Sequence, residues 1–350
     1  MSYHRSAIFC LGFLLFFSNC KKIDSCSRPF KNEAIPQLNR ICFGSCASEN
    51  KSQPILNTVV NKQPDLFVYV GDNIYGDTKD MNVLENKYYK LCSKNEFQNL
   101  ITHVKTIATW DDHDYGANDS GKNYTKKEAS KKRFIEFWGE ENNADRNSHD
   151  GIYTSYYWGD SAHRVQVILL DCRTFRDDLI TNNSGNYMPN YNPNATMLGD
   201  AQWTWLKAEL QKPAKVRIIA SSTQFSRSYD GYEAWANFPL EQQKMTATIQ
   251  AAQANGVLFI SGDVHLAELS KLNNSNSYPI YDFTSSGMTQ LEEVDIANNN
   301  RIGSVGLDYN IGMIDIDWSN MNDILLVCKI VGLSGNEELN HVIHLNDLAF

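Results

Sequence analysis

The sequence predicts a mixed α/β protein in which two β-sheets pack face to face. From Arg40 onward, short apolar runs of strand character alternate with longer stretches of helical spacing. The strand-like runs are rich in β-branched residues and mostly apolar throughout, which is typical of strands covered on both faces. They number roughly ten, and that many strands fit two packed sheets better than one open sheet.

The expected strands lie throughout the body of the chain, and the region from Tyr278 to Val331 reverts to strands without an expected helix. In chain order the segments are Leu66–Val70, Lys105–Trp110, Val165–Leu170, Val216–Ala220, Val257–Ile260, Ile280–Thr284, Gly312–Asp317 and Ile324–Cys328.

Helical stretches separate these strands. In the first of them, apolar residues recur at helical spacing after Pro54, and proline suits the first turn of a helix. The expected helices are Pro54–Lys62, Lys126–Glu141, Gln202–Gln211 and Leu240–Asn255. Two polar segments, Thr181–Asn194 and Ala297–Gly306, are expected to be loops, and long loops in α/β domains often bind ligands.

The first twenty residues have the pattern of an export signal. Arg5 is positively charged, Ile8 to Phe17 is almost wholly apolar, and Cys20 follows. The apolar core is ~10 residues long, too short to span a bilayer as a mature helix. The segment 1–20 resembles a bacterial lipoprotein signal that leaves a lipid on Cys20; the alternative is an ordinary signal peptide cut nearby. We therefore expect an exported cell-envelope lipoprotein, facing the periplasm or the cell surface and contacting the membrane through that lipid.

The rest of the chain is expected to be a tether and one folded domain. Residues 21–39 are polar and lack periodicity, as in a linker. No low-complexity segment divides residues 40–350, which we expect to be one catalytic domain.

The charge balance argues against strong nucleic-acid binding. The chain has 32 basic and 41 acidic residues, a formal net charge of −9. A sequence-independent binder of nucleic acid needs a basic face. Phosphate chemistry remains compatible with this balance, because bound cations reverse the local sign of charge.

Export permits disulfides, but the cysteine spacing indicates neither zinc nor a redox pair. Cys42, Cys172 and Cys328 lie within or beside apolar runs. We expect these three to be buried free thiols.

Polar groups that bind metals follow the apolar runs. Gly71-Asp72 comes directly after Leu66–Val70, where a carboxylate can bridge two cations. Tyr75 follows three residues later, and Cys46 ends Phe43-Gly44-Ser45-Cys46. A thiolate and a phenolate beside carboxylates suit iron better than calcium or magnesium. Each motif alone also fits a simple turn or a packed side chain.

The segment Asp111-Asp112-His113-Asp114 is the densest polar cluster after an apolar run. Carboxylates this close repel one another unless cations or hydrogen-bond donors offset them. We interpret Asp112 as a metal ligand and His113 as the group that hydrogen-bonds substrate or protonates the leaving oxygen. Asn118 is a further candidate amide ligand, and a solvated acidic turn is the alternative for the whole segment.

Two more strand-end motifs complete the set. In Gly262-Asp263-Val264-His265, residues two apart point to one face of an extended segment, so Asp263 and His265 can converge. Arg173, after Leu170-Asp171-Cys172, can clamp a phosphate oxygen with two donors. The alternative for Arg173 is a surface salt bridge.

Together these motifs resemble the alkaline phosphatase D family of PhoD-like metallophosphoesterases, within the calcineurin-like superfamily. The resemblance extends to Leu170-Asp171-Cys172-Arg173, where cysteine replaces the family's threonine, and to Leu198–Leu206, Phe283–Gly287 and Asn310–Ile314. It covers roughly Ile41 to Ile330, and we expect no counterpart of the large N-terminal all-β domain that some members carry before the catalytic domain.

The resemblance implies a four-layer αββα sandwich of two mixed sheets flanked by helices. It also implies an iron (Fe³⁺) site with calcium (Ca²⁺) alongside, other divalent metals being an alternative. Carried over by motif, the iron ligands are Cys46, Asp72, Tyr75 and Asp263. The second cation position takes Asp72, Asp112, Asp263 and either His265 or Asn118, while Arg173 and His113 contact the phosphoryl group.

The function these residues predict is an exported metal-dependent phosphatase. It hydrolyses small phosphate monoesters with a metal-activated hydroxide or oxo group as nucleophile. The alternatives are a phosphodiesterase that uses the same site and a surface lipoprotein that binds ligands without catalysis. A nuclease is chemically compatible but is disfavoured by the acidic charge.

Overall fold

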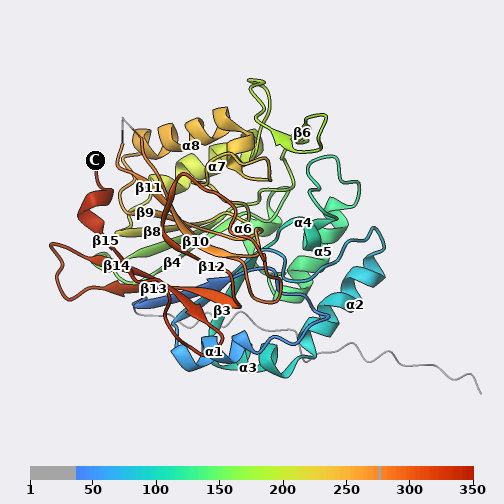
Figure 1. Ribbon diagram of the computed structural model, residues 1–350, viewed down its shortest axis with the longest axis horizontal. Coiled ribbons are helices and arrows are strands. Elements are labelled where there is room, and N and C mark those ends of the chain that lie inside the picture. The colour runs from blue at the N-terminus through green and yellow to red at the C-terminus, as the bar shows by residue number, and fades with distance from the viewer. Residues whose placement is uncertain (1–36, 275–276) are drawn as a thin grey trace, which may run out of the picture.

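The computed structural model describes residues 37–274 and 277–350, which form two β-sheets with helices on both outer faces (Figure 1). The expected signal 1–20, with Cys20, and residues 21–36 of the expected tether lie outside the described residues. Leu38, at the end of that tether segment, is already fully buried in the core. The Trp318 indole also donates to the Leu38 carbonyl oxygen at 2.9 Å, so the packed body includes this residue.

The first sheet has six strands, of which the three earliest run parallel to one another. β13 pairs antiparallel with β1 and joins the C-terminal strands to this parallel group. The spatial order is β15 (His341–His344), β14 (Leu325–Gly332), β13 (Asn310–Asp317), β1 (Arg40–Gly44), β2 (Leu66–Val70) and β3 (Lys105–Thr109).

The second sheet has seven strands, with a parallel group at its centre. The spatial order is β12 (Arg301–Gly306), β10 (Ala267–Leu272), β11 (Ile280–Ser285), β9 (Val257–Ser261), β8 (Val216–Ala220), β5 (Val165–Leu169) and β4 (Thr154–Trp158). A separate hairpin consists of β6 (Ile180–Thr181) and β7 (Tyr187–Met188).

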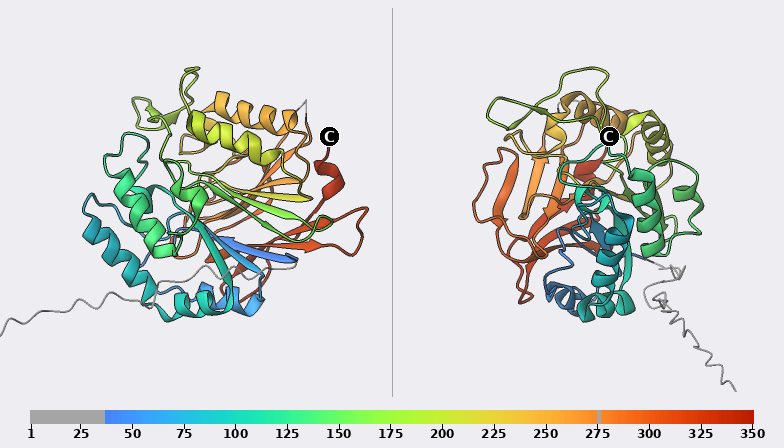
Figure 2. Two further views of the ribbon diagram at one scale, coloured as in Figure 1. Left: turned by 180° about the vertical axis from the view of Figure 1, so that it is seen from behind. Right: turned by 90° about the vertical axis from the view of Figure 1, so that its right-hand side faces the viewer.

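Helices cover the outer faces of the two sheets. In Figures 1 and 2, α7 (Gly199–Leu210) and α8 (Pro239–Ala251) lie on one side of the molecule, and α1 (Ile55–Lys62) and α3 (Asn95–His103) lie on the opposite side. The remaining helices are α2 (Met81–Cys92), α4 (Asp112–Tyr115), α5 (Lys127–Trp138), α6 (Ala144–Asn147) and the 3₁₀ turns Trp235–Asn237 and Leu345–Leu348. This order of layers confirms the predicted αββα sandwich.

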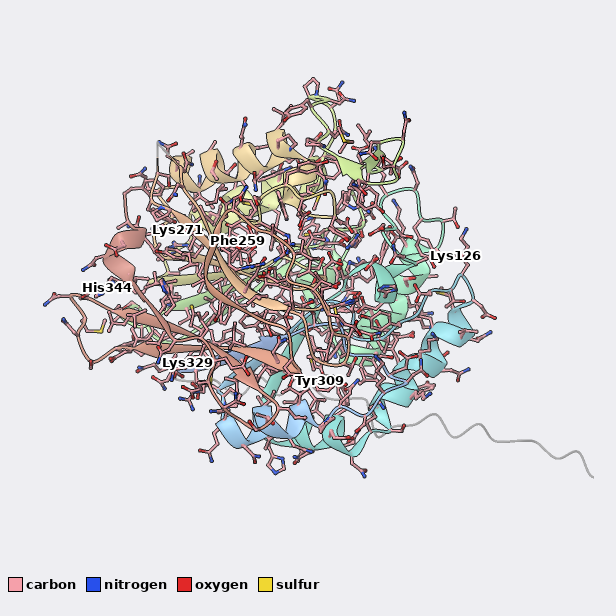
Figure 3. The ribbon with its side chains drawn as sticks, in the orientation of Figure 1. Lys126, Phe259, Lys271, Tyr309, Lys329 and His344 are labelled. Atoms are coloured by element: carbon pink, nitrogen blue, oxygen red, sulfur yellow. The ribbon has the colours of Figure 1, made fainter. Side chains whose placement is uncertain are left out.

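Alternating side chains of the inner strands build the core. Phe43 and Val68 belong to the cluster shared with the second sheet, whereas Phe67 and Tyr69 belong to the cluster under α1, α2 and α3. This period of two follows from the geometry of a strand. Phe43 meets Phe283 of the other sheet edge to face, with ring centroids 5.1 Å apart, and therefore couples the two sheets. Phe259 of β9, labelled in Figure 3, is fully buried.

Most predicted elements are confirmed, with shifted ends. The prediction of a loop over Ala297–Gly306 is wrong for the second half of this segment, because residues 301–306 form β12. This strand pairs with β10 alone and is partly exposed, so an edge strand can keep a polar sequence. The helices α2 and α3 were not predicted.

The cysteine prediction is confirmed: Cys42, Cys172 and Cys328 are buried free thiols. Burial raises the pKa of the Cys172 thiol to about 11, which makes it unreactive at neutral pH. Cys92 is disulfide-bonded. Among the described residues, no helix has the length and apolar character needed to cross a membrane.

Candidate metal centre

The candidate site lies at the edge where the parallel strands of both sheets end. The chain passes from β1 to Cys46, from β2 to Asp72 and from β3 to Asp112 in the first sheet, and from β9 to Asp263 in the second. Ligand sites in open α/β sheets form beyond the carboxyl ends of the strands. The strand-end reasoning from the sequence therefore placed these residues at the correct edge.

The backbone adopts an unusual conformation at these positions. Cys46, Asp72, Asp263 and His265 have φ values of 59°, 51°, 75° and 60°. Non-glycine residues in the left-handed region are uncommon and concentrate at functional sites, where surrounding structure offsets their strain. The fold thus holds four of the predicted ligands in a conformation that their side chains do not favour.

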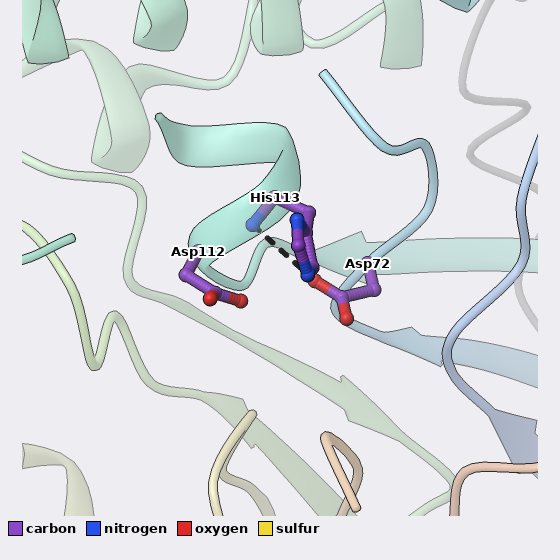
Figure 4. Close-up of side chains that lie close together, drawn as sticks. All are labelled: Asp72, Asp112 and His113. Atoms are coloured by element: carbon purple, nitrogen blue, oxygen red, sulfur yellow. Dashed lines mark hydrogen bonds between the residues drawn. The ribbon is translucent and has the colours of Figure 1, made fainter. Parts of the chain in front are cut away.

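Two groups of side chains that could hold a metal ion share Asp112. Asp72, Asp112 and His113 offer ligand atoms that lie within 4.8 Å of one another, and so do Asp111, Asp112 and Asp263. The His113 main-chain N–H also donates to Asp72 Oδ1 at 3.4 Å. Figure 4 shows the carboxylates of Asp72 and Asp112 on the same side of the short helix α4. Asp111 was not predicted as a ligand, although it belongs to the predicted acidic segment.

Cys46 lies beside the acidic centre. Its thiol donates to Asp72 Oδ2 at 3.4 Å and lies 3.6 Å from the main-chain oxygen of Asp263. Residues that follow β1, β2 and β9 therefore meet around one sulfur atom, although Cys46 and Asp263 are 217 positions apart in sequence.

Tyr75 and the two histidines form the adjoining wall of the site. Tyr75 Oη lies 3.3 Å from His265 Nε2, and the Tyr75 ring packs on His113 with centroids 4.3 Å apart. His113 Nδ1 lies 2.7 Å from Asp77 Oδ1. The structure thus brings Tyr75, His113 and His265 together, as the sequence predicted.

Glycine permits the close approach of the two acidic strand ends. A Cβ atom on Gly71, whose φ is 105°, would lie 2.5 Å from Cβ of Asp111. No side chain fits this gap, because real Cβ atoms do not approach so closely. Gly71 therefore allows the ends of β2 and β3 to place Asp72 and Asp111 side by side.

Arg173 is more enclosed than the sequence suggested. It is fully buried, its Nε donates to Asp111 Oδ1 at 2.5 Å, and its Nη1 donates to both oxygens of Glu233 at 2.9 Å. Nη2 lies 3.7 Å from Asp112 and has no hydrogen-bond partner among the described residues. A buried guanidinium held in this way orients Asp111 and leaves Nη2 as its free donor.

The predicted amide ligand Asn118 lies on the exposed turn after α4. Its Nδ2 donates to Asp119 Oδ2 at 2.6 Å. Asp119, rather than Asn118, reaches the acidic centre, because its main-chain N–H donates to Asp112 Oδ2 at 2.6 Å. Neither Asp119 nor Glu233 was predicted. Asp119 adjoins a predicted ligand, but nothing in the sequence around Glu233 indicates a site.

Comparison with known families decides what kind of protein this is. The profile described as PhoD-like phosphatase matches residues 41–300, most of the chain. The chain belongs to the PhoD-like phosphatase family. Membership implies a phosphoric ester hydrolase.

This PhoD-like phosphatase has a curated relative and several solved structural neighbours. It is 24% identical to alkaline phosphatase D of Bacillus subtilis (strain 168) over 288 residues, which are 70% of this chain and 48% of the relative. It therefore spans about half the length of that relative.

The structural neighbours show the shared fold. A structure described as PhoD superposes with a TM-score of 0.67 and 18% identity, covering 89% of this chain and 69% of that one. A dimetal phosphatase from Danio rerio superposes with a TM-score of 0.59 and 11% identity, covering 88% and 99%. These likenesses confirm the predicted metallophosphoesterase fold.

The electrostatics of the PhoD-like phosphatase fit a site for cations. Burial, followed by the neighbouring Cys46 thiol and Asp112, raises the pKa of Asp72 well above its usual value, and burial also raises that of Asp263. Asp111 Oδ2 and Asp112 Oδ1 are buried and have no hydrogen-bond partner among the described residues. Such groups are costly unless something positive pairs with them. Bound cations would remove that cost.

Burial also favours the uncharged forms of Cys46, Tyr75 and His265. Burial raises the pKa of the Cys46 thiol to about 11, and burial and Cys46 raise the pKa of Tyr75. Thiolate and phenolate forms are therefore unfavourable here without a metal, which stabilises both. Burial lowers the pKa of His265, which keeps its imidazole neutral and able to donate a lone pair.

Proposed function

We propose that this chain is a metal-dependent phosphatase that hydrolyses small phosphate monoesters. The observation that carries the proposal is the pair of candidate metal-binding groups that share Asp112, in which Asp111 and Asp112 each have a buried oxygen without a hydrogen-bond partner among the described residues. Two cations close together can clamp a phosphate ester, and family membership supplies the class of reaction.

The proposed cofactors are Fe³⁺ and Ca²⁺. Cys46, Asp72, Tyr75 and Asp263 would hold the iron, since the Cys46 sulfur lies 3.4 Å from Asp72 Oδ2 and 3.6 Å from the main-chain oxygen of Asp263, and the set combines soft and hard ligands. Asp72, Asp112 and Asp263, with His265, would hold the second cation; Asn118, the other candidate from the sequence, is turned to Asp119 instead. When bound, the cations would neutralise the phosphoryl oxygens and make an attacking water more acidic.

The protein's own residues would position the ester and move its proton. His113 is fixed through Nδ1 by Asp77 and lies over the Tyr75 ring, so its orientation is set before substrate arrives. Burial alone would lower its pKa, but Asp77 and Asp112 raise it overall, which favours the protonated form that can supply a proton to the leaving oxygen. Arg173 would offer Nη2 to a phosphoryl oxygen.

The decisive experiment is the variant Asp72→Asn, assayed with p-nitrophenyl phosphate after metal loading and elemental analysis. We expect turnover to be abolished and bound metal to fall, because Asn cannot bridge two cations. Asp317→Asn, at an exposed strand end remote from the site, is the matched control. Near-normal turnover by metal-replete Asp72→Asn would show that the site assignment is wrong.

The same assay separates ester classes. We expect p-nitrophenyl phosphate to be hydrolysed with the higher kcat/KM and bis-p-nitrophenyl phosphate with the lower. The reverse order would make the protein a phosphodiesterase that uses the same residues. Elemental analysis reports iron and calcium independently of activity.

We also propose that the protein is exported and anchored to the cell envelope through a lipid on Cys20. The support is the sequence alone, in which the apolar run Ile8 to Phe17 precedes that cysteine. Metabolic labelling with a fatty acid should mark the wild-type protein and leave Cys20→Ala unlabelled. Labelling of Cys20→Ala would contradict the proposal.

A further inference from the structure

Two loops that hydrogen bonds connect to the candidate metal centre carry tyrosine side chains. Tyr187 belongs to β7 of the small hairpin, and Tyr229 and Tyr232 belong to the segment after β8. Tyr229 and Tyr232 are 44% and 60% exposed, although large aromatic side chains are usually buried more deeply. We call these three residues the tyrosine rim.

The two loops form one unit. The Tyr187 main-chain N–H donates to the Gly231 carbonyl at 2.9 Å, and Tyr229 Oη donates to the Tyr187 carbonyl at 2.7 Å. Other large apolar side chains of the hairpin, Ile180 and Met188, are also exposed. Figures 1 and 2 show the hairpin on the same side of the molecule as α4, which carries Asp112.

Direct hydrogen bonds connect this unit to the acidic centre. The Tyr187 hydroxyl donates to Asp119 Oδ2, and the Asp119 main-chain N–H donates to Asp112 Oδ2 at 2.6 Å. Tyr232 directly precedes Glu233, whose carboxylate holds Arg173. Two hydrogen bonds therefore link Tyr187 to the proposed metal ligand Asp112. Tyr232 adjoins Glu233, which holds Arg173, the residue proposed to donate a hydrogen bond to the phosphoryl group.

The rim also lacks exposed positive charge. Residues 178–200 contain neither lysine nor arginine. The single arginine of segment 221–238, Arg227, is buried and paired with Asp230 and Glu268. Within these two segments a second phosphate group or a polyanion would find no exposed cation, and the nearby Lys122 is already paired with Asp177, whereas an uncharged ring would find aromatic faces.

We propose that the tyrosine rim binds the alcohol part of the ester and selects phosphate esters whose alcohol carries an uncharged ring. This inference rests on the proposed phosphatase function and specifies its substrate class. Tyr229 and Tyr232 supply ring contacts, and Tyr187 fixes their loop against Asp119. The phosphoryl group then lies at the metal centre while the ring lies against the rim.

The test compares two esters with similar alkoxide leaving groups, 2-phenylethyl phosphate and ethyl phosphate, by phosphate release from the metal-loaded full chain. The measured quantity is the ratio of their kcat/KM values. We expect Tyr229→Ser/Tyr232→Ser to lower this ratio roughly tenfold, the size of effect that two ring contacts produce. Tyr229→Phe/Tyr232→Phe should keep the ratio, because the rings remain.

Val342→Ser, which removes an exposed apolar side chain on β15, is the control and should leave the ratio unchanged. Binding of 2-phenylethylphosphonate and ethylphosphonate, measured by calorimetry, should show the same selective loss without turnover. An unchanged ratio in the double serine variant, with wild-type circular dichroism, would overturn the rim proposal alone. Failure of the metal-loaded wild type to hydrolyse either ester would overturn the proposed function, and the rim proposal with it.

Discussion

The ion pairs of Glu233 lead to a sharp stability prediction. Glu233 is buried, accepts two hydrogen bonds at 2.9 Å from Arg173 Nη1, and lies 3.2 Å from Arg176 Nε. Glu233→Gln keeps the shape and one acceptor oxygen but removes the charge that both guanidinium groups face. Removing one partner of a buried pair costs about 3–5 kcal/mol, and the retained acceptor places the expected loss near the lower limit, about 3 kcal/mol.

The pH dependence of this loss has a definite sign. Burial alone would raise the pKa of Glu233, but Arg173 and Arg176 lower it from 4.5 to about 2. A carboxyl group whose pKa is lower in the folded state stabilises the protein at pH values above its unfolded-state pKa. This stabilisation is lost as the pH falls through its folded-state pKa. The difference in the free energy of unfolding between wild type and Glu233→Gln should therefore have its maximum value at pH 7. It should decrease as the pH falls from 4.5 toward 2.

The assay is urea denaturation at a fixed metal concentration for all variants, since bound metal itself adds stability. Glu141→Gln, an exposed carboxylate, is the matched control and should stay within about 0.5 kcal/mol of wild type. A Glu233→Gln protein as stable as that control at pH 7 would refute the reasoning that these buried pairs stabilise the site.

Three further predictions follow from the same contacts. Gly71→Ala should unfold at lower urea and bind less metal, because its Cβ would collide with that of Asp111 at 2.5 Å and its φ of 105° is strained for alanine; wild-type metal content would contradict this. Tyr187→Phe should cost about 1 kcal/mol in urea denaturation, since it removes one hydroxyl hydrogen bond to Asp119, and no change would mean that this bond is not formed in solution. Metal affinity measured by calorimetry should increase with pH above the usual carboxylate pKa, because the raised pKa of Asp72 makes protons compete with the cation, and a flat profile would exclude that competition.

The strand-end motifs were predictable because their logic is local. Each apolar run ends in a residue such as Asp72 or Asp263, and parallel strands bring their carboxyl ends to one edge whatever the path between them. Helix α2 was also recoverable, since Leu84, Tyr88 and Leu91 recur at helical spacing and are buried. The many polar residues of α2 made this apolar periodicity hard to recognise.

Other features depend on loops whose course the sequence does not specify. Glu233 reaches Arg173 because the segment after β8 turns back over the site, and no motif marks that turn. The enclosure of Arg173 could not be predicted for the same reason. A sequence pattern can indicate that an arginine follows a strand, but only the fold decides how many carboxylates surround it.

The candidate ligands come from both sheets, with Asp72 and Asp112 from one and Asp263 from the other. An ion bound among them would link the two sheets, which otherwise meet through apolar contacts such as Phe43 against Phe283. A substitution in the apolar interface between the two sheets would then lower the affinity for metal without changing any ligand. Metal binding would in turn stabilise that interface.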